Sequence, residues 1–84
     1  MMNQFFQNVM LEFTLKGKEL VLAYERRTEK CTWSVFDIGG VEVCSGMLAD
    51  HGPHSIPLDA LSPDLYQLCV IDGSELMKTK FRLA

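Results

Sequence analysis

The sequence predicts an all-β protein, a sandwich of seven antiparallel strands in one domain. Apolar and polar residues alternate along most of the 84 residues, and this period of two is typical of strands that bury one face. Turn-forming residues separate the alternating runs at intervals of roughly 8–12 residues, a spacing typical of β-sandwiches. No long run has the helical period of about 3.6 residues. A chain of this length has room for a single hydrophobic core.

The predicted strands follow one another with short turns between them. An N-terminal arm at residues 1–8 precedes the single domain at residues 9–84. We expect the strand at residues 54–58 near a sheet edge, because Pro53 and Pro57 flank it and proline cannot donate a backbone hydrogen bond. The seven strands are expected at residues 9–16, 19–25, 31–36, 41–48, 54–58, 66–71 and 76–83.

The stretch around Tyr66 says most about the architecture. Tyr66 enters a strand just after the turn at Pro63, and Asp72 and Gly73 close that strand. In immunoglobulin-like sandwiches, an aromatic residue in this place ties the turn to the backbone through its hydroxyl group. Trp33, in the third predicted strand, suits a position between two sheets. We therefore expect a seven-stranded antiparallel immunoglobulin-like β-sandwich.

Charge and hydropathy exclude several classes of partner. The formal net charge of −3 offers no basic surface for nucleic acid, and an acidic membrane would repel the protein. No run approaches the ~20 apolar residues that span a bilayer. The first eleven residues lack the basic and apolar regions of a signal peptide. We expect no nucleic-acid partner and no membrane span. We expect a cytoplasmic location for the chain as it is written, and a secreted or cell-surface location if it is the tail of a longer protein.

The three cysteines, Cys31, Cys44 and Cys69, are widely spaced and form no C-x-x-C pair. Neither a zinc ribbon nor a thioredoxin-type site is therefore indicated. We expect all three to be small buried side chains that stay reduced. One disulfide and one free thiol is the alternative.

His51 and His54 flank a Gly-Pro turn next to Asp50 and are the only cluster of metal-ligating residue types. A metal site needs three or four ligands, which this spacing does not supply. We interpret the two residues as ordinary loop histidines, with a metal site as the alternative, and predict no metal and no cofactor.

No pattern of catalytic residues stands out. Ser45, Ser55 and Ser62 have no nucleophile-elbow sequence around them, and the acidic residues are scattered at strand ends. A small sandwich also leaves little room for the ~300–1,000 Å³ pockets that ligands use. We predict that the protein is not an enzyme.

An apolar surface patch is predicted from three residues that alternate out of phase with the core. Phe36, Cys69 and Ile71 would face outward and favour a partner or a dimer. Shielding of this patch by Phe5 and Phe6 of the N-terminal arm is the alternative.

The last predicted strand turns Lys78, Lys80 and Arg82 toward solvent. Outward charge of this kind protects an edge strand against aggregation. The same three cations are also a candidate binding surface.

Short motifs in the second half of the chain carry a family resemblance. The first motif, at residues 35–43, consists of two strands joined by an Asp-x-x-Gly turn, and the second, at residues 55–61, is a strand with the pattern Ile-x-Leu-x-x-Leu. The third motif is Asp64-Leu65-Tyr66, and the fourth is Asp72-Gly73 followed by the basic strand at residues 78–81. In this order they resemble the C-terminal sorting domains of the type IX secretion system, and the small bacterial immunoglobulin-like domains of unknown function that share this terminal pattern. The sequence departs from the sorting domains at Asp64, where they have Gly, and lacks their Asn-Pro opening.

The resemblance implies an immunoglobulin-like sandwich whose basic last strand, Lys78, Lys80 and Arg82, faces export machinery. The function that we favour is a non-enzymatic immunoglobulin-like protein-interaction module of a bacterial protein, which binds a protein partner through a sheet face or an exposed strand edge. The alternative is a C-terminal secretion sorting domain. A third hypothesis is self-association, either edge to edge or through the Phe36 side.

Overall fold

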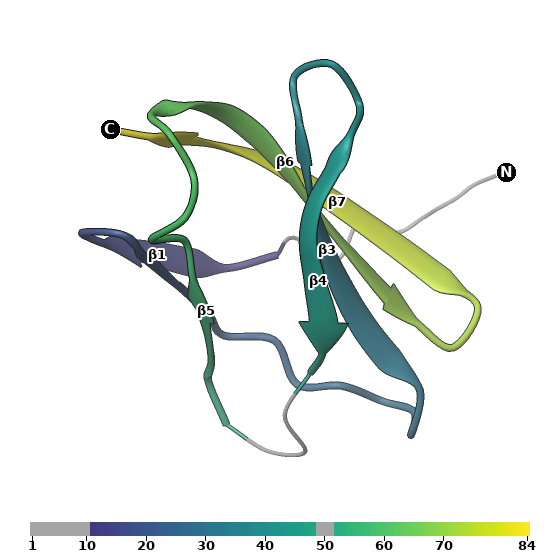
Figure 1. Ribbon diagram of the computed structural model, residues 1–84. Coiled ribbons are helices and arrows are strands. Elements are labelled where there is room, and N and C mark those ends of the chain that lie inside the picture. The colour runs from purple at the N-terminus through teal and green to yellow at the C-terminus, as the bar shows by residue number, and fades with distance from the viewer. Residues whose placement is uncertain (1–10, 49–51) are drawn as a thin grey trace, which may run out of the picture.

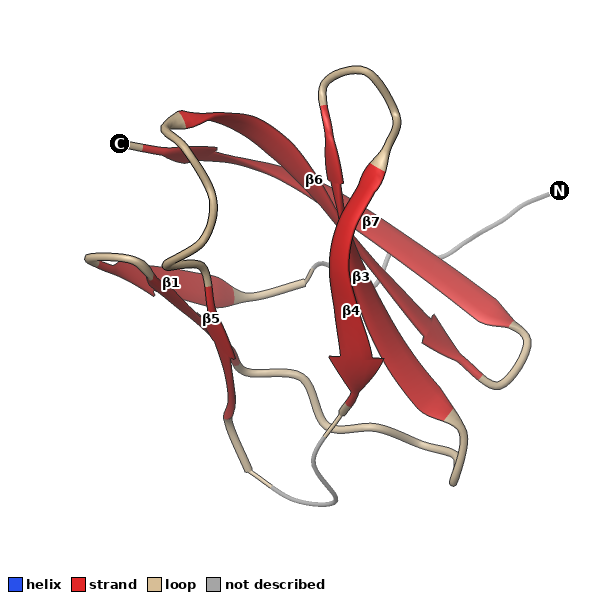
Figure 2. Cartoon of the chain, in the orientation of Figure 1, coloured by secondary structure: helices blue, strands red, loops and turns tan. Residues whose placement is uncertain are grey.

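The computed structural model describes residues 11–48 and 52–84, and these residues form seven strands and no helix (Figures 1 and 2). The all-β prediction is therefore confirmed for this part of the chain. The predicted arm at residues 1–8 lies outside the described residues. The strands are β1 (Phe13–Lys16), β2 (Glu19–Leu22), β3 (Cys31–Asp37), β4 (Glu42–Met47), β5 (His54–Pro57), β6 (Asp64–Asp72) and β7 (Glu75–Leu83).

The strands make two antiparallel sheets. One has three strands in the order β1-β2-β5, and the other has four in the order β4-β3-β6-β7. Figure 1 shows the smaller sheet facing the larger one, with β4 and β7 at the two edges of the larger sheet. The expected edge position of β5 is confirmed.

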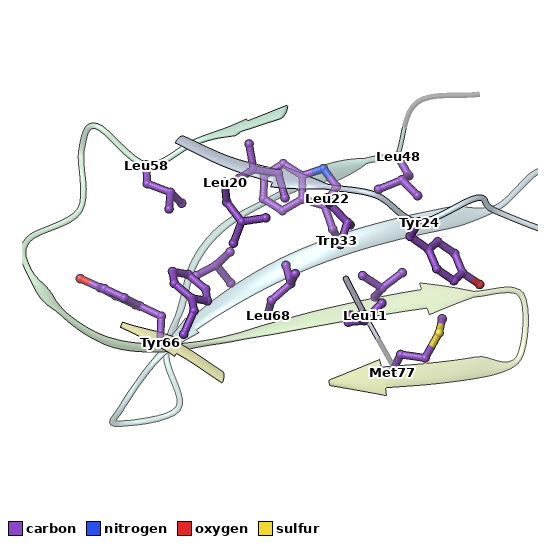
Figure 3. Close-up of a cluster of buried hydrophobic side chains, with 14 of the residues drawn as sticks. Leu11, Leu20, Leu22, Tyr24, Trp33, Leu48, Leu58, Tyr66, Leu68 and Met77 are labelled. Atoms are coloured by element: carbon purple, nitrogen blue, oxygen red, sulfur yellow. The ribbon is translucent and has the colours of Figure 1, made fainter. Parts of the chain in front are cut away.

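One hydrophobic core fills the space between the sheets (Figure 3). The smaller sheet contributes Leu20, Leu22 and Ile56, all fully buried. The larger sheet contributes alternate residues of β3, β6 and β7, because side chains in a strand point to opposite faces in turn. These inward residues of the larger sheet include Trp33, Val35, Tyr66, Leu68, Val70, Met77, Phe81 and Leu83.

Strand β4 departs from simple alternation. Val35 pairs with Cys44, but Phe36 pairs with Glu42, so one extra residue, Val43, lies in β4 at this point. Such a β-bulge changes which side chains face the core. Val43 is therefore partly exposed and Val41, before the strand, is exposed, although we expected both in one continuous strand at residues 41–48.

Two side chains fix turns next to the larger sheet. Asp37 accepts hydrogen bonds at Oδ1 from the backbone N–H groups of Gly39 and Val41, both at 2.9 Å, and so holds the β3–β4 turn. The Tyr66 hydroxyl donates to the carbonyl oxygen of Ser62 at 2.6 Å. The predicted link between Tyr66 and the preceding turn is thereby confirmed.

Asp72, the buried charged residue of this core, organises the loop between β2 and β3. Its Oδ2 accepts hydrogen bonds from the Tyr24 hydroxyl and the Arg27 N–H, both at 2.7 Å. Its Oδ1 accepts from the Thr28 N–H at 3.0 Å and from the Thr28 hydroxyl at 2.6 Å. The backbone of the charged stretch at residues 26–30 thus wraps around a carboxylate, through the N–H groups of Arg27 and Thr28.

The pKa of Asp72 reflects this arrangement. Burial alone would raise it, but the hydrogen bonds from Thr28, Arg27 and Tyr24 outweigh burial and lower the pKa from 3.8 to about 2. Burial and the bond to this carboxylate raise the pKa of Tyr24, which therefore stays protonated and keeps donating. The network is complete when Asp72 is ionised.

Candidate functional site

The two outer faces of the sandwich differ in character. In the part of the chain that the structure describes, every large exposed hydrophobic residue belongs to the larger sheet or to its β3–β4 turn. The outer face of the smaller sheet carries polar side chains instead, among them Thr14 and Ser55, whose hydroxyl donates to Glu19. The exposed hydrophobic residues are Ile38, Val41, Val43, Met47, Leu65, Ile71 and Leu76.

Strand register arranges the outward side chains of the larger sheet in rows that cross it. Residues directly opposite in neighbouring strands share a face. Thr32 pairs with Met47 on one side and with Ile71 on the other, and Ile71 pairs with Leu76. We call Met47, Thr32, Ile71 and Leu76 the apolar row. Its three large hydrophobic side chains are 59%, 45% and 55% exposed, so the row is an apolar strip open to solvent.

A second row is charged at both ends. Phe36 pairs with Glu42 on β4 and with Gln67 on β6, and Gln67 pairs with Lys80 on β7. We call Glu42, Phe36, Gln67 and Lys80 the charged row. It places a carboxylate at one edge of the sheet and an ammonium group at the other.

A third row lies between the other two. Ser34 pairs with Ser45 and with Cys69, and Cys69 pairs with Lys78. Among the described residues of the larger sheet, the positive charge on this face comes from β7, where Lys78, Lys80 and Arg82 are exposed as expected.

A groove with a volume of about 760 Å³ runs over this face. Phe36, Cys69, Ile71, Lys78 and Lys80 all line it, so the structure brings the predicted apolar patch together with two of the three predicted cations. Arg82 does not line the groove. The expectation that so small a sandwich has little room for a pocket was wrong, because the groove is open on the outside of the sheet and does not need space between the sheets.

The three residues of the predicted apolar patch lie on the outer face of the larger sheet, but they are exposed to different extents. Ile71 is 45% exposed, Phe36 is half-buried, and Cys69 is only 8% exposed. Sequence reasoning missed Leu76 and Met47. The alternation that turned Lys78 outward also turns Leu76 outward, so this signal was present in the sequence. The outward position of Met47 depends on the bulge in β4, and no residue type in the sequence signals this bulge.

The three cysteines are free thiols. Cys31 and Cys69 are buried as expected, but Cys44 is only half-buried, since it lies on the edge strand β4. Burial raises the pKa of each thiol, and for Cys69 the nearby Lys78 works in the opposite direction. Protonated thiols are poor nucleophiles and poor metal ligands.

Residues 11–48 and 52–84 contain no group of three His, Cys, Asp or Glu side chains that could hold a metal ion. Asp50 and His51 lie outside the described residues, so a metal site in that loop remains a hypothesis. His54 is half-buried on β5, with its ring centroid 6.1 Å from that of Trp33. Within the described residues no helix is long and apolar enough to cross a membrane.

Comparison with protein-family models finds no match for this sequence, and comparison with curated proteins finds none.

Proposed function

We propose that this protein is a non-enzymatic immunoglobulin-like module that binds another protein through the outer face of its four-stranded sheet. The immunoglobulin-like assignment is supported by Trp33 between the sheets and by the bond from Tyr66 to the preceding turn. In the constant-type arrangement the fourth strand joins the first sheet. Here β4 pairs with β3 instead and enlarges the sheet that carries the groove.

The observation that carries the proposal is the one-sided exposure of hydrophobic residues. Both outer faces are built on the same alternation, and only one of them exposes a strip of large apolar side chains. A contiguous exposed apolar patch rimmed by polar residues is typical of protein interaction sites. Lys78 and Lys80 at the rim add electrostatic steering toward an acidic partner.

The proposal predicts that changing the apolar row weakens partner binding. Replacing Ile71 and Leu76 together by Thr places a β-branched residue, which suits a strand, at both positions and removes exposed apolar surface. We expect binding of a partner, first captured with the wild-type chain and then purified, to weaken at least roughly tenfold in isothermal titration calorimetry.

Val21→Thr supplies the matched control. Val21 lies on the outer face of the smaller sheet, opposite Thr14 and Ser55. The control variant is expected to bind the partner like the wild type. Equal affinity of the wild type and the Ile71→Thr/Leu76→Thr variant, with both folded, would rule out the larger sheet as the binding face.

A secretion sorting domain is the second proposal, and the placement of the basic strand supports it. β7 is an edge strand, and Lys78, Lys80 and Arg82 are all exposed on it. If export machinery reads these cations, replacing the three by Ser stops export of a cargo fused in front of the chain. Unchanged export of the fused cargo would end this hypothesis.

A further inference from the structure

We propose that the outer face of the four-stranded sheet binds a second copy of the same chain, with β4 of each copy facing β7 of the other. The inference rests on the proposed function, because it uses the same face and names its partner. It follows from the order of charges and apolar side chains across the rows.

The face is polarised from one edge to the other. Glu42 lies at the β4 edge of the charged row and Lys80 at the β7 edge, with Phe36 and Gln67 between them. Both charged side chains are exposed and line the groove. Asp37 adds a second carboxylate near the β3–β4 turn, and Lys78 a second ammonium group on β7. A surface with opposite charges at its two edges can complement itself.

A two-fold axis parallel to the strands makes use of this polarity. Such an axis places the four-stranded sheets of the two copies face to face. β4 of one copy then lies over β7 of the other, and each row lies over the same row of the other copy in reverse order. Glu42 of each copy then faces Lys80 of the other, and the two contacts are equivalent, as an isologous dimer requires. In the apolar row, Met47 faces Leu76 and Thr32 faces Ile71, and this removes the exposed strip from water.

The competing arrangements bring like charges together. An axis across the strands would stack β7 on β7 with the residue order reversed, so that cations of one copy lie beside cations of the other; with Lys80 on the axis, for example, Lys78 faces Arg82. Antiparallel pairing of two β7 edges would place the same cations on one face of a continuous sheet, about 5 Å apart across strands. Like charges directly opposite are destabilising, so self-association through the β7 edge is disfavoured and the Phe36 side is favoured.

The area of the outer face determines how strongly the two copies are expected to bind each other. Four strands about 4.8 Å apart, over the six residues of β4 at about 3.4 Å each, cover roughly 400 Å² of flat sheet per copy. The two copies together therefore contribute about 800 Å² of flat sheet. The relief of the side chains raises the total buried area to about the 1,000 Å² at which specific interfaces begin. A weak and reversible dimer is therefore expected.

Charge exchange tests the arrangement directly. The full chain and its Glu42→Lys, Lys80→Glu and Glu42→Lys/Lys80→Glu variants are compared by sedimentation equilibrium over a range of protein concentrations. We expect the wild type to dimerise reversibly, each single variant to weaken the dimer about 3- to 10-fold, and the double variant to recover most of that loss. Lys18→Glu, in the β1–β2 turn, is the matched control and should leave dimerisation unchanged.

A double variant no better than the single variants would overturn the pairing of β4 with β7. A wild-type chain that is monomeric at every concentration would overturn the proposal that a second copy is the partner. Amine labelling of the monomer then decides whether the proposed function fails as well. Free reaction of Lys78 and Lys80 leaves the face open to a different protein, so the proposed function stands. Protection of both lysines in a monomer places another segment of the same chain on the face, and the proposed function fails as well.

Discussion

Replacing Asp72 by Asn is expected to lower the free energy of unfolding by about 3–5 kcal/mol. The carboxylate accepts four hydrogen bonds from Tyr24, Arg27 and Thr28 across 44 to 48 residues of sequence. An amide of the same shape has one oxygen, and its NH₂ group would point at donors that need an acceptor. Buried donors without acceptors carry the full cost of leaving water.

Urea unfolding followed by circular dichroism measures the Asp72 effect. Asp59→Asn is the matched control, because Asp59 is an exposed acidic residue in the β5–β6 connection and its change should matter little. A loss below about 1 kcal/mol for Asp72→Asn would show that the network does not hold the β2–β3 loop to β6.

The same carboxylate predicts how stability depends on pH. The pKa of Asp72 is about 2 in the folded protein and near its ordinary value of 3.8 in the unfolded chain. Its contribution is therefore fully present above pH 3.8 and is lost as the pH falls toward 2, and its size is about 2–3 kcal/mol. In the Asp72→Asn variant this part of the acid destabilisation should be absent.

Replacing Gly46 by Ala is the second substitution for which we expect a large effect. It should lower the free energy of unfolding by about 1–3 kcal/mol. A Cβ atom at this position would lie 2.8 Å from Cζ2 and 3.0 Å from Cε2 of Trp33. Trp33 is only 7% exposed and is packed between the sheets, so its ring has little space in which to move. The glycine in β4 is therefore required by the close approach of the indole.

Gly39→Ala is the control for this prediction. A Cβ atom at Gly39 meets only Oδ1 of Asp37, at 3.4 Å, which is an ordinary contact. Urea unfolding should show the Gly39 variant close to the wild type and the Gly46 variant clearly below it. Equal stability of the two variants would mean that β4 can move away from Trp33 without cost.

Local patterns in the sequence were sufficient to predict most strands. Alternation placed Trp33 and Tyr66 inward and Lys78 outward, and the turn at Pro63 predicted the hydrogen bond of the Tyr66 hydroxyl. These features depend on residues a few positions apart, where side-chain direction and turn chemistry decide the structure.

Features that depend on pairing between distant strands could not be predicted in the same way. The bulge at Val43 arises where β3 and β4 meet, and it sets the outward position of Met47. Asp72 was interpreted as a turn residue because its donors come from a loop more than 40 residues earlier. The candidate site has the same origin, since the apolar and charged rows exist only once the order β4-β3-β6-β7 is known.

The most direct test of a binding face on the larger sheet is ¹⁵N NMR of the full chain, recorded with increasing protein concentration and with a purified partner. We predict amide shift changes that gather at Thr32, Ile71 and Lys78, on the outer face of the four-stranded sheet. Val21 and Ser55, on the outer face of the smaller sheet, should not move. Shift changes that gather on β1, β2 and β5 instead would contradict the proposed function and the proposed dimer together.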